Sequence, residues 1–179
     1  MIHLITVSGK SARHFYLRPE CVSDFKSLVR TITSENPMVI STRFRSDVFY
    51  KGDSSCSEAI LKMWTLYGGM YNIKTDPSDV FSSDGDQEAL ERYFHSINAL
   101  SLNWYYYNQY RKAFSSAYSE DRQNTLAATI LQCDEHLTRL PCTRRASLRC
   151  DMETTAPGPA SKDHFALAMR LLNNQSHIN

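Results

Sequence analysis

Hydrophobic residues between positions 36 and 69 form two short runs at helical spacing, with a polar break between them. Asn36 and Pro37 are a favourable helix start. The apolar residues of the first run recur at every fourth position: Ile40, Phe44 and Val48. A capping box at residues 55–58 precedes the second run, whose stripe is Ile60, Met63, Trp64 and Tyr67. The pattern predicts a helix-turn-helix over residues 36–69.

Residues 39–50 also fit a different period. The residues that alternate along this stretch are Ile40, Thr42, Phe44, Ser46, Val48 and Tyr50. Alternation with a period of two is typical of a β-strand. If residues 39–50 form a strand, the helix-turn-helix is lost.

The rest of the chain predicts mostly helix. Residues 2–7 and 13–17 favour strands and predict a β-hairpin within residues 1–18. Apolar stripes predict helices over three ranges: 19–33, 87–118 and 120–140. Residues 151–161 have the composition of a linker, and residues 162–179 predict a last helix and tail. We therefore expect a mainly α fold with a small N-terminal β-hairpin, in one domain of residues 1–150.

Charge placement adds to this picture more than composition does. The 179 residues are 42% hydrophobic with a net charge of +1, so no global charge attracts nucleic acid or a membrane. Residues 1–51 nevertheless hold eight basic and four acidic residues, whereas residues 75–91 hold six acids and no base. Such blocks are typical either of a DNA-facing surface opposite one that avoids DNA, or of ordinary solvated faces.

The chain lacks the segments that direct proteins to membranes. No run approaches the roughly 20 apolar residues of a membrane span, and the first seven residues do not resemble a signal peptide. Five widely spaced cysteines favour reduced thiols over disulfides. We expect a cytoplasmic protein with no membrane partner.

The predicted helix-turn-helix indicates DNA as the ligand. Ser57, at the start of the second helix, is placed to reach base edges, and Lys62 faces away from the apolar stripe toward a phosphate. The other basic residues expected to hold the DNA backbone in register are Arg43, Arg45, Lys51, Arg144 and Arg145. These residues predict a DNA-binding transcriptional regulator that works in a homo- or hetero-oligomer.

Four residues late in the predicted domain form a candidate zinc site: Cys133, His136, Cys142 and Cys150. Tetrahedral zinc accepts three thiolates and one imidazole, and Cys133 and His136 share a helix face by their spacing. Alternatively, Cys133 belongs to the apolar stripe of its own helix, where a buried thiol is ordinary.

The run at residues 104–107, Trp-Tyr-Tyr-Tyr, is a candidate stacking platform for single-stranded nucleic acid. Consecutive helix positions point in different directions, so Trp104 and Tyr107 are expected in the core. The tyrosines expected at a protein interface are Tyr105, Tyr106 and Tyr110. No nucleophile or metalloprotease signature is present, so no enzyme is predicted. The alternative function is a small interaction or assembly protein, such as a viral or phage accessory factor that binds a host or particle protein.

Residues 144–148 read Arg-Arg-Ala-Ser-Leu, which matches the preference of basophilic kinases. A phosphate on Ser147 would add negative charge among several arginines. A basic loop that contacts DNA phosphates or solvent accounts for the same residues. The sequence alone favours the basic loop.

A family resemblance is carried by residues 56–69, Cys-Ser-Glu-Ala-Ile-Leu-Lys-Met-Trp-Thr-Leu-Tyr-Gly-Gly. This run resembles the recognition-helix region of FlhC, a subunit of the bacterial flagellar master activator, and of related activators. Later positions follow a similar order over about residues 40–150: His95, Ala99, Tyr110, Arg111, Cys142 and Cys150. The resemblance implies a transcription activator that binds promoter DNA within a hetero-oligomer and contacts RNA polymerase. The four clustered cysteines of that family are matched here only by Cys142 and Cys150.

Overall fold

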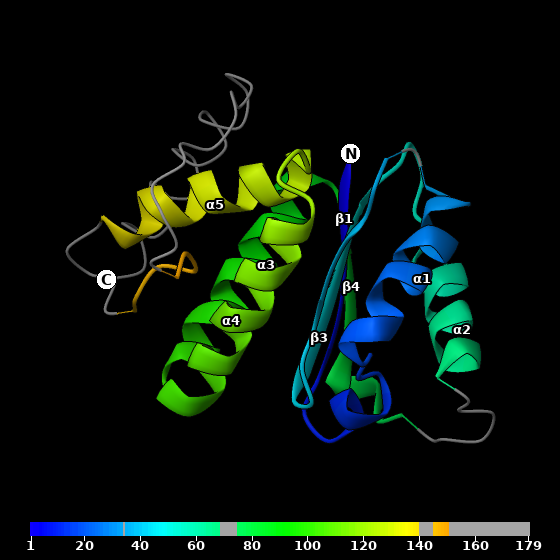
Figure 1. The fold of residues 1–179 in the computed structure, drawn as a ribbon, viewed down its shortest axis with the longest axis horizontal. Helices are drawn as coiled ribbons and strands as arrows, with labels where there is room; N and C mark the ends of the chain where they lie inside the picture. Colours follow the sequence, from blue (N-terminus) through cyan, green and yellow to red (C-terminus); the bar gives the residue numbers. More distant parts are fainter. Residues whose placement is uncertain (34, 69–74, 140–144, 151–179) are drawn as a thin grey trace.

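A four-stranded antiparallel β-sheet forms the centre of the protein (Figure 1). This computed structural model describes residues 1–33, 35–68, 75–139 and 145–150. The strands are β1 (Ile2–Ser8), β2 (Met38–Ser41), β3 (Arg45–Lys51) and β4 (Val80–Asp84), in the order β2-β3-β1-β4. The long N-terminal strand β1 is therefore central and pairs with both β3 and β4.

Helices cover both faces of the sheet. Helices α1 (Pro19–Arg30) and α2 (Ser57–Tyr67) lie on one face, and α3 (Asp86–Ser101), α4 (Trp104–Glu120) and α5 (Thr125–Thr138) lie on the other (Figure 1). Short 3-10 turns, Ser11–His14 and Pro77–Asp79, complete the elements. The first six strands and helices follow the β-α-β-β-α-β order of a split βαβ, or ferredoxin-like, arrangement. None of the helices in the described ranges is long and apolar enough to cross a membrane.

The expected mainly α fold is wrong, and so is the helix-turn-helix. Residues 38–51 form the β2–β3 hairpin, with Val39 opposite Val48 and Met38 opposite Phe49. The stretch forms strands because β3 pairs with β1 along its whole length and both faces of the hairpin are buried. Val39 and Val48 pack under α1 and α2, while Met38 and Phe49 pack under α3 to α5.

The predicted N-terminal hairpin is also wrong. Only its first arm is a strand, because β1 finds its partners in β3 and β4, far along the chain. Residues 11–14 form a 3-10 turn instead, and Phe15 and Leu17 are buried beneath α2 and α1. The β-forming composition of residues 13–17 therefore reflects burial of alternate side chains in a connecting segment.

The amphipathic helices are predicted well, apart from their ends. The expected helix over 19–33 is α1, and the expected helix over 120–140 is α5, whose start is set by the Asn124 side chain accepting from the Leu126 and Ala127 amides. The single helix expected over 87–118 is divided into α3 and α4, because the side chain of Asn103 caps a new helix by accepting from the Tyr106 amide. The predicted linker and last helix, residues 151–179, lie outside the described residues.

Each layer of helices encloses its own core. Between the sheet and α1 and α2, Trp64 of α2 is 1% exposed and packs against the rings of Phe15 and Phe25 at centroid distances of 5.3 and 5.2 Å. Its indole nitrogen donates to the carbonyl oxygen of Phe15 at 3.1 Å. This polar contact ties α2 to the segment that follows β1.

His3 on β1 joins three segments at one end of the sheet. Its Nδ1 lies 2.8 Å from Oδ1 of Asp84 on β4, and its Nε2 lies 3.2 Å from the carbonyl oxygen of Gly52. The His3 ring also stacks on Tyr50 of β3, with 4.8 Å between the ring centroids. The hydrogen bond with His3 lowers the pKa of Asp84 below its ordinary value of 3.8.

We expect Asp84→Asn to destabilise the protein at neutral pH and to have a smaller effect in acid. Because the folded-state pKa of Asp84 is lowered, its carboxylate stabilises the fold above the unfolded-state pKa of about 3.9. That contribution is lost as the pH falls through the lower, folded-state pKa. The effect is small because the Asp84 side chain is 51% exposed. Thermal melts from pH 7 to pH 2 should show a difference in Tm that narrows below about pH 4, whereas a constant difference would contradict this account.

Candidate functional site: a basic aromatic surface beside the β2–β3 turn

Two of the arginines predicted to bind DNA are buried. Arg45 is 4% exposed and pairs with Asp47 through two hydrogen bonds, Nε to Oδ2 at 2.7 Å and Nη2 to Oδ1 at 3.0 Å. Burial alone would lower the pKa of Arg45, but the Asp47 carboxylate outweighs it and the pKa is raised. Arg145 is 8% exposed and donates to Asp134 at 2.5 Å. Both guanidinium groups face internal carboxylates and not solvent.

The remaining predicted DNA contacts are scattered over the molecule. Lys51, at the far end of β3 from the turn, pairs with Glu35 at 3.0 Å, and Lys62 pairs with Glu58 on the exposed side of α2 at 2.7 Å. Ser57 is buried, with its hydroxyl 2.9 Å from the hydroxyl of Tyr50. Arg144 lies outside the described residues. Of the predicted set within the described ranges, Arg43 alone lies on the surface built by the β2–β3 turn.

The predicted zinc ligands do not come together in the described part of the chain. Cys133 is fully buried in the core beneath α5, and burial raises the pKa of its thiol to about 12, which disfavours a thiolate ligand. His136 follows on the same helix, and Cys150 is partly exposed beyond it. No group of three His, Cys, Asp or Glu side chains suited to a metal occurs among the described residues. Cys142 lies outside them, so the zinc site stays a prediction.

The tyrosines of α4 divide between core and surface. Tyr110 is fully buried and donates to Oδ2 of Asp47 at 2.5 Å, so it does not reach an external partner. Tyr105 and Tyr106 are 66% and 43% exposed, as an interface role requires. Trp104 was expected in the core but is the first residue of α4 and is 61% exposed.

Two adjoining grooves bring these tyrosines together with the β2–β3 turn and the segment before α1. One groove, of about 660 Å³, is lined by Tyr16, Ser41, Thr42, Arg43, Phe44, Tyr105, Tyr106, Gln109, Lys112 and Ala113. The other, of about 540 Å³, is lined by Arg13, Tyr16, Arg18, Pro19, Glu20 and Arg43. They share Tyr16 and Arg43 and form one continuous surface. We call these lining residues the basic aromatic surface.

Local hydrogen bonds build the central part of this surface. The Thr42 hydroxyl donates to the carbonyl oxygen of Arg45 at 2.6 Å and accepts from the Arg45 amide at 3.1 Å. These bonds close a tight turn that leaves Arg43 exposed and Phe44 partly exposed. The Leu17 amide donates to the Ser41 hydroxyl at 2.8 Å, which holds the neighbouring Tyr16 beside the edge strand β2.

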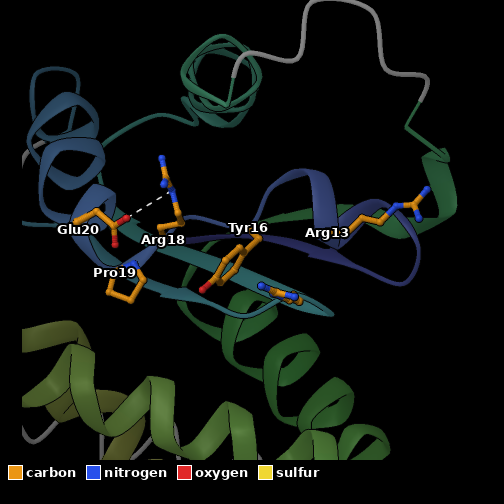
Figure 2. Close-up of a pocket in the computed structure, with 6 residues that line it drawn as sticks. Arg13, Tyr16, Arg18, Pro19 and Glu20 are labelled. Carbon is orange, nitrogen blue, oxygen red and sulfur yellow. Dashed lines mark ion pairs between the residues drawn. The ribbon is translucent and has the colours of Figure 1, made fainter.

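Aromatic rings on the surface lie in contact with one another and with a guanidinium group. The guanidinium carbon of Arg43 is 5.7 Å from the centroid of the Tyr16 ring, within the range of a cation–π contact. The ring of Phe44 is 4.7 Å from that of Tyr106, which is 5.6 Å from the ring of Tyr105. Figure 2 shows Tyr16 near the middle of the smaller groove, between Arg13 and Pro19.

The surface carries an excess of positive charge. Its four cations are Arg13, Arg18, Arg43 and Lys112, all exposed. Glu20 is the single acid among the lining residues, and it pairs with Arg18 at 3.5 Å (Figure 2). An anionic ligand with flat or apolar groups matches this combination of cations and rings.

Sequence reasoning identified three of these surface residues, Arg43, Tyr105 and Tyr106, and missed the rest. Tyr16 and Phe44 were assigned to a strand and to a helix stripe, so their exposure could not be foreseen. No local pattern marks the turn at Arg43 and Phe44, because the alternation of residues 39–50 continues through Thr42, Phe44 and Ser46.

Comparisons of the chain with protein-family models, with curated proteins and with solved structures found no match. The resemblance to FlhC therefore stays a prediction.

Proposed function

We propose that this protein is a non-enzymatic binding protein that holds single-stranded nucleic acid on the basic aromatic surface. The observation that carries the proposal is the grouping of four aromatic rings and four cations on one pair of grooves, with a single, already paired acid. Proteins that bind single strands combine a positively charged groove with aromatic side chains on which bases stack. The proposal keeps the cytoplasmic location that the sequence predicts.

The rings provide the contacts to bases. Tyr105 and Tyr106 are exposed, and Phe44 supports Tyr106 from the side of the β2–β3 turn. An exposed ring stacks on a base of any identity because every base presents a flat face. We therefore expect binding with little sequence preference.

The cations provide the contacts to phosphates. Arg43 lies between the two grooves, Arg13 and Arg18 flank the smaller one, and Lys112 borders the larger one. Binding should weaken with salt, because each phosphate contact releases counterions and contributes about −0.7 to the slope of log K against log salt concentration.

A single strand fits better than a duplex. Bases in a duplex are stacked on each other, and reading them requires an exposed element that enters a groove. Helix α2, the predicted recognition helix, packs Ile60 and Trp64 into the core and pairs its exposed Lys62 with Glu58. The surface instead offers rings that need an unstacked base.

We expect Tyr106→Ala to weaken binding of a labelled oligothymidylate by at least about fivefold, since one stacked base contributes about 1–3 kcal/mol. Arg43→Ala should also weaken binding, because it removes a phosphate contact. Fluorescence anisotropy at several salt concentrations measures both affinity and slope. Arg43→Ala should also reduce the steepness of the salt dependence by about 0.7. Lys62→Ala is the matched control: it removes one exposed positive charge on α2, away from the grooves, and should leave binding unchanged.

The same assay distinguishes the alternative function. Retention of an acidic polypeptide such as polyglutamate, with no retention of oligothymidylate or oligouridylate at low salt, would favour an interaction or assembly protein that uses this surface. Equal loss of oligonucleotide binding in Lys62→Ala and Arg43→Ala would show attraction to net charge only and would overturn the proposed site.

A further inference from the structure

Residues 145–150 form a segment without helix or strand that is hydrogen-bonded to side chains of α3, α4 and α5. Leu148 is fully buried in the core beneath these helices. From α4, Arg111 donates to the carbonyl oxygens of Ser147 at 2.5 Å and Arg149 at 2.8 Å. The segment is independent of the basic aromatic surface.

The attachment of the segment to α5 is made by one buried carboxylate. Asp134 of α5 is fully buried and accepts three hydrogen bonds from the segment: from Arg145 Nη1 at 2.5 Å, Ser147 Oγ at 2.6 Å and the Leu148 amide at 2.8 Å. Arg145 also donates from Nε to the side chain of Asn98 on α3 at 2.7 Å. Its Nη2 atom has no hydrogen-bond partner among the described residues. The attraction within a buried ion pair offsets the desolvation of its charges only when the remaining donors are also hydrogen-bonded. This pair therefore contributes little net stability to the attachment of the segment.

We infer that Ser147 is a phosphorylation site for a basophilic serine/threonine kinase, and that its phosphorylation releases residues 145–150 from α5. In this step the Ser147 Oγ attacks the γ-phosphorus of ATP, forming the Oγ–P bond as the bond to the bridging β,γ-oxygen breaks. ADP leaves, and the hydroxyl proton passes to the catalytic carboxylate of the kinase. Two arginines at positions 144 and 145 stand three and two residues before Ser147, the spacing such kinases prefer.

Phosphorylation is incompatible with the closed arrangement because of the role of the hydroxyl. Ser147 is a donor to Asp134, and a phosphate dianion can only accept. The modified residue would therefore place about −1.5 to −2 charges against a fully buried carboxylate. Arg145, which balances Asp134, leaves with the segment and can then pair with the phosphate two residues further on.

The kinase must act on an opened form. Ser147 is partly exposed, but Arg145 is buried against Asp134 and cannot be recognised until the segment lifts away. The rate of phosphorylation should therefore follow the population of the opened segment. A variant that loosens the segment becomes a better substrate, whereas a serine that is simply on the surface would not respond.

The test uses the full chain, the catalytic subunit of the cyclic-AMP-dependent kinase, and ATP with magnesium. We expect phosphate on Ser147 by mass spectrometry, none in Ser147→Ala, and phosphorylation at least about tenfold faster in Asp134→Asn. Hydrogen exchange of residues 145–150 and of α5 should accelerate after modification. Absence of phosphate on Ser147 in both the natural chain and Asp134→Asn would overturn the site, and unchanged exchange after modification would overturn the release.

A matched pair of variants tests the charge argument without a kinase. Ser147→Asp and Ser147→Asn have nearly the same size and both remove the hydroxyl, but only Ser147→Asp adds negative charge beside Asp134. We expect faster exchange and tryptic cleavage in the segment for Ser147→Asp than for Ser147→Asn. Equal behaviour of the two variants would show that the lost hydroxyl, and not charge, opens the segment, and would contradict the mechanism.

Discussion

Asp47→Asn is expected to lower the free energy of unfolding by about 3–5 kcal/mol, because it leaves Arg45 charged and unpaired inside the protein. Asp47 is fully buried and accepts hydrogen bonds from Arg45, from the Thr6 hydroxyl at 2.6 Å and from the Tyr110 hydroxyl at 2.5 Å. Asparagine keeps the shape of the side chain but removes the charge that compensates the guanidinium. Burial, followed by the Asp47 charge, raises the pKa of Tyr110 well above 10, so its hydroxyl stays protonated as a donor.

Urea unfolding followed by circular dichroism measures this effect. The control is Glu58→Gln, which breaks the exposed pair with Lys62 and should cost less than about 1 kcal/mol. A paired replacement, Arg45→Met with Asp47→Leu, removes both charges and should recover much of the lost stability. A loss below about 1 kcal/mol for Asp47→Asn would mean that water reaches Arg45 and that the network is not buried.

Trp64→Ala is expected to lower the free energy of unfolding by about 3–5 kcal/mol, the usual effect of removing a buried aromatic side chain. Trp64 connects α2 to Phe15 and Phe25, so its loss opens a cavity between two helices and the sheet. The variant also leaves the carbonyl oxygen of Phe15 without the hydrogen bond that the indole nitrogen donates to it.

Two further variants separate the effect of the lost apolar contact from that of the lost hydrogen bond. Trp64→Phe keeps most of the apolar contact and loses the hydrogen bond, so we expect a cost nearer 1–2 kcal/mol. Leu66→Ala removes an apolar side chain that is 57% exposed on the same helix and should have an effect below about 0.5 kcal/mol. Equal losses for Trp64→Ala and Leu66→Ala would contradict the burial of this face of α2.

Helix α2 illustrates what local pattern can and cannot establish. The stripe of Ile60 and Trp64 places this helix and its buried face correctly. The predicted capping box does not form: Cys56 occupies the cap position without a side-chain hydrogen bond, and Glu58 pairs with Lys62 instead. A helix can be predicted because its apolar residues repeat over three turns. A cap cannot be predicted in the same way, because it depends on the conformation of single residues.

The β2–β3 hairpin is the place where two local patterns conflicted. Ile40, Phe44 and Val48 are spaced by four, which fits both a helix of period 3.6 and a strand of period two. Pairing with β1 resolves the conflict, because the strand is buried on both faces and gains hydrogen bonds along its length. No feature within residues 39–50 reveals that β1 is available.

The sequence by itself determined the amphipathic helices and the exposure of Tyr105 and Tyr106. Each of these depends on neighbours within a few residues. The tertiary structure alone decided the sheet order, the burial of Arg45 beside Asp47, and the meeting of Tyr16, Arg43 and Tyr106 on one surface. Those features arise from strand pairing and packing between segments tens of residues apart, for which local periodicity carries no information.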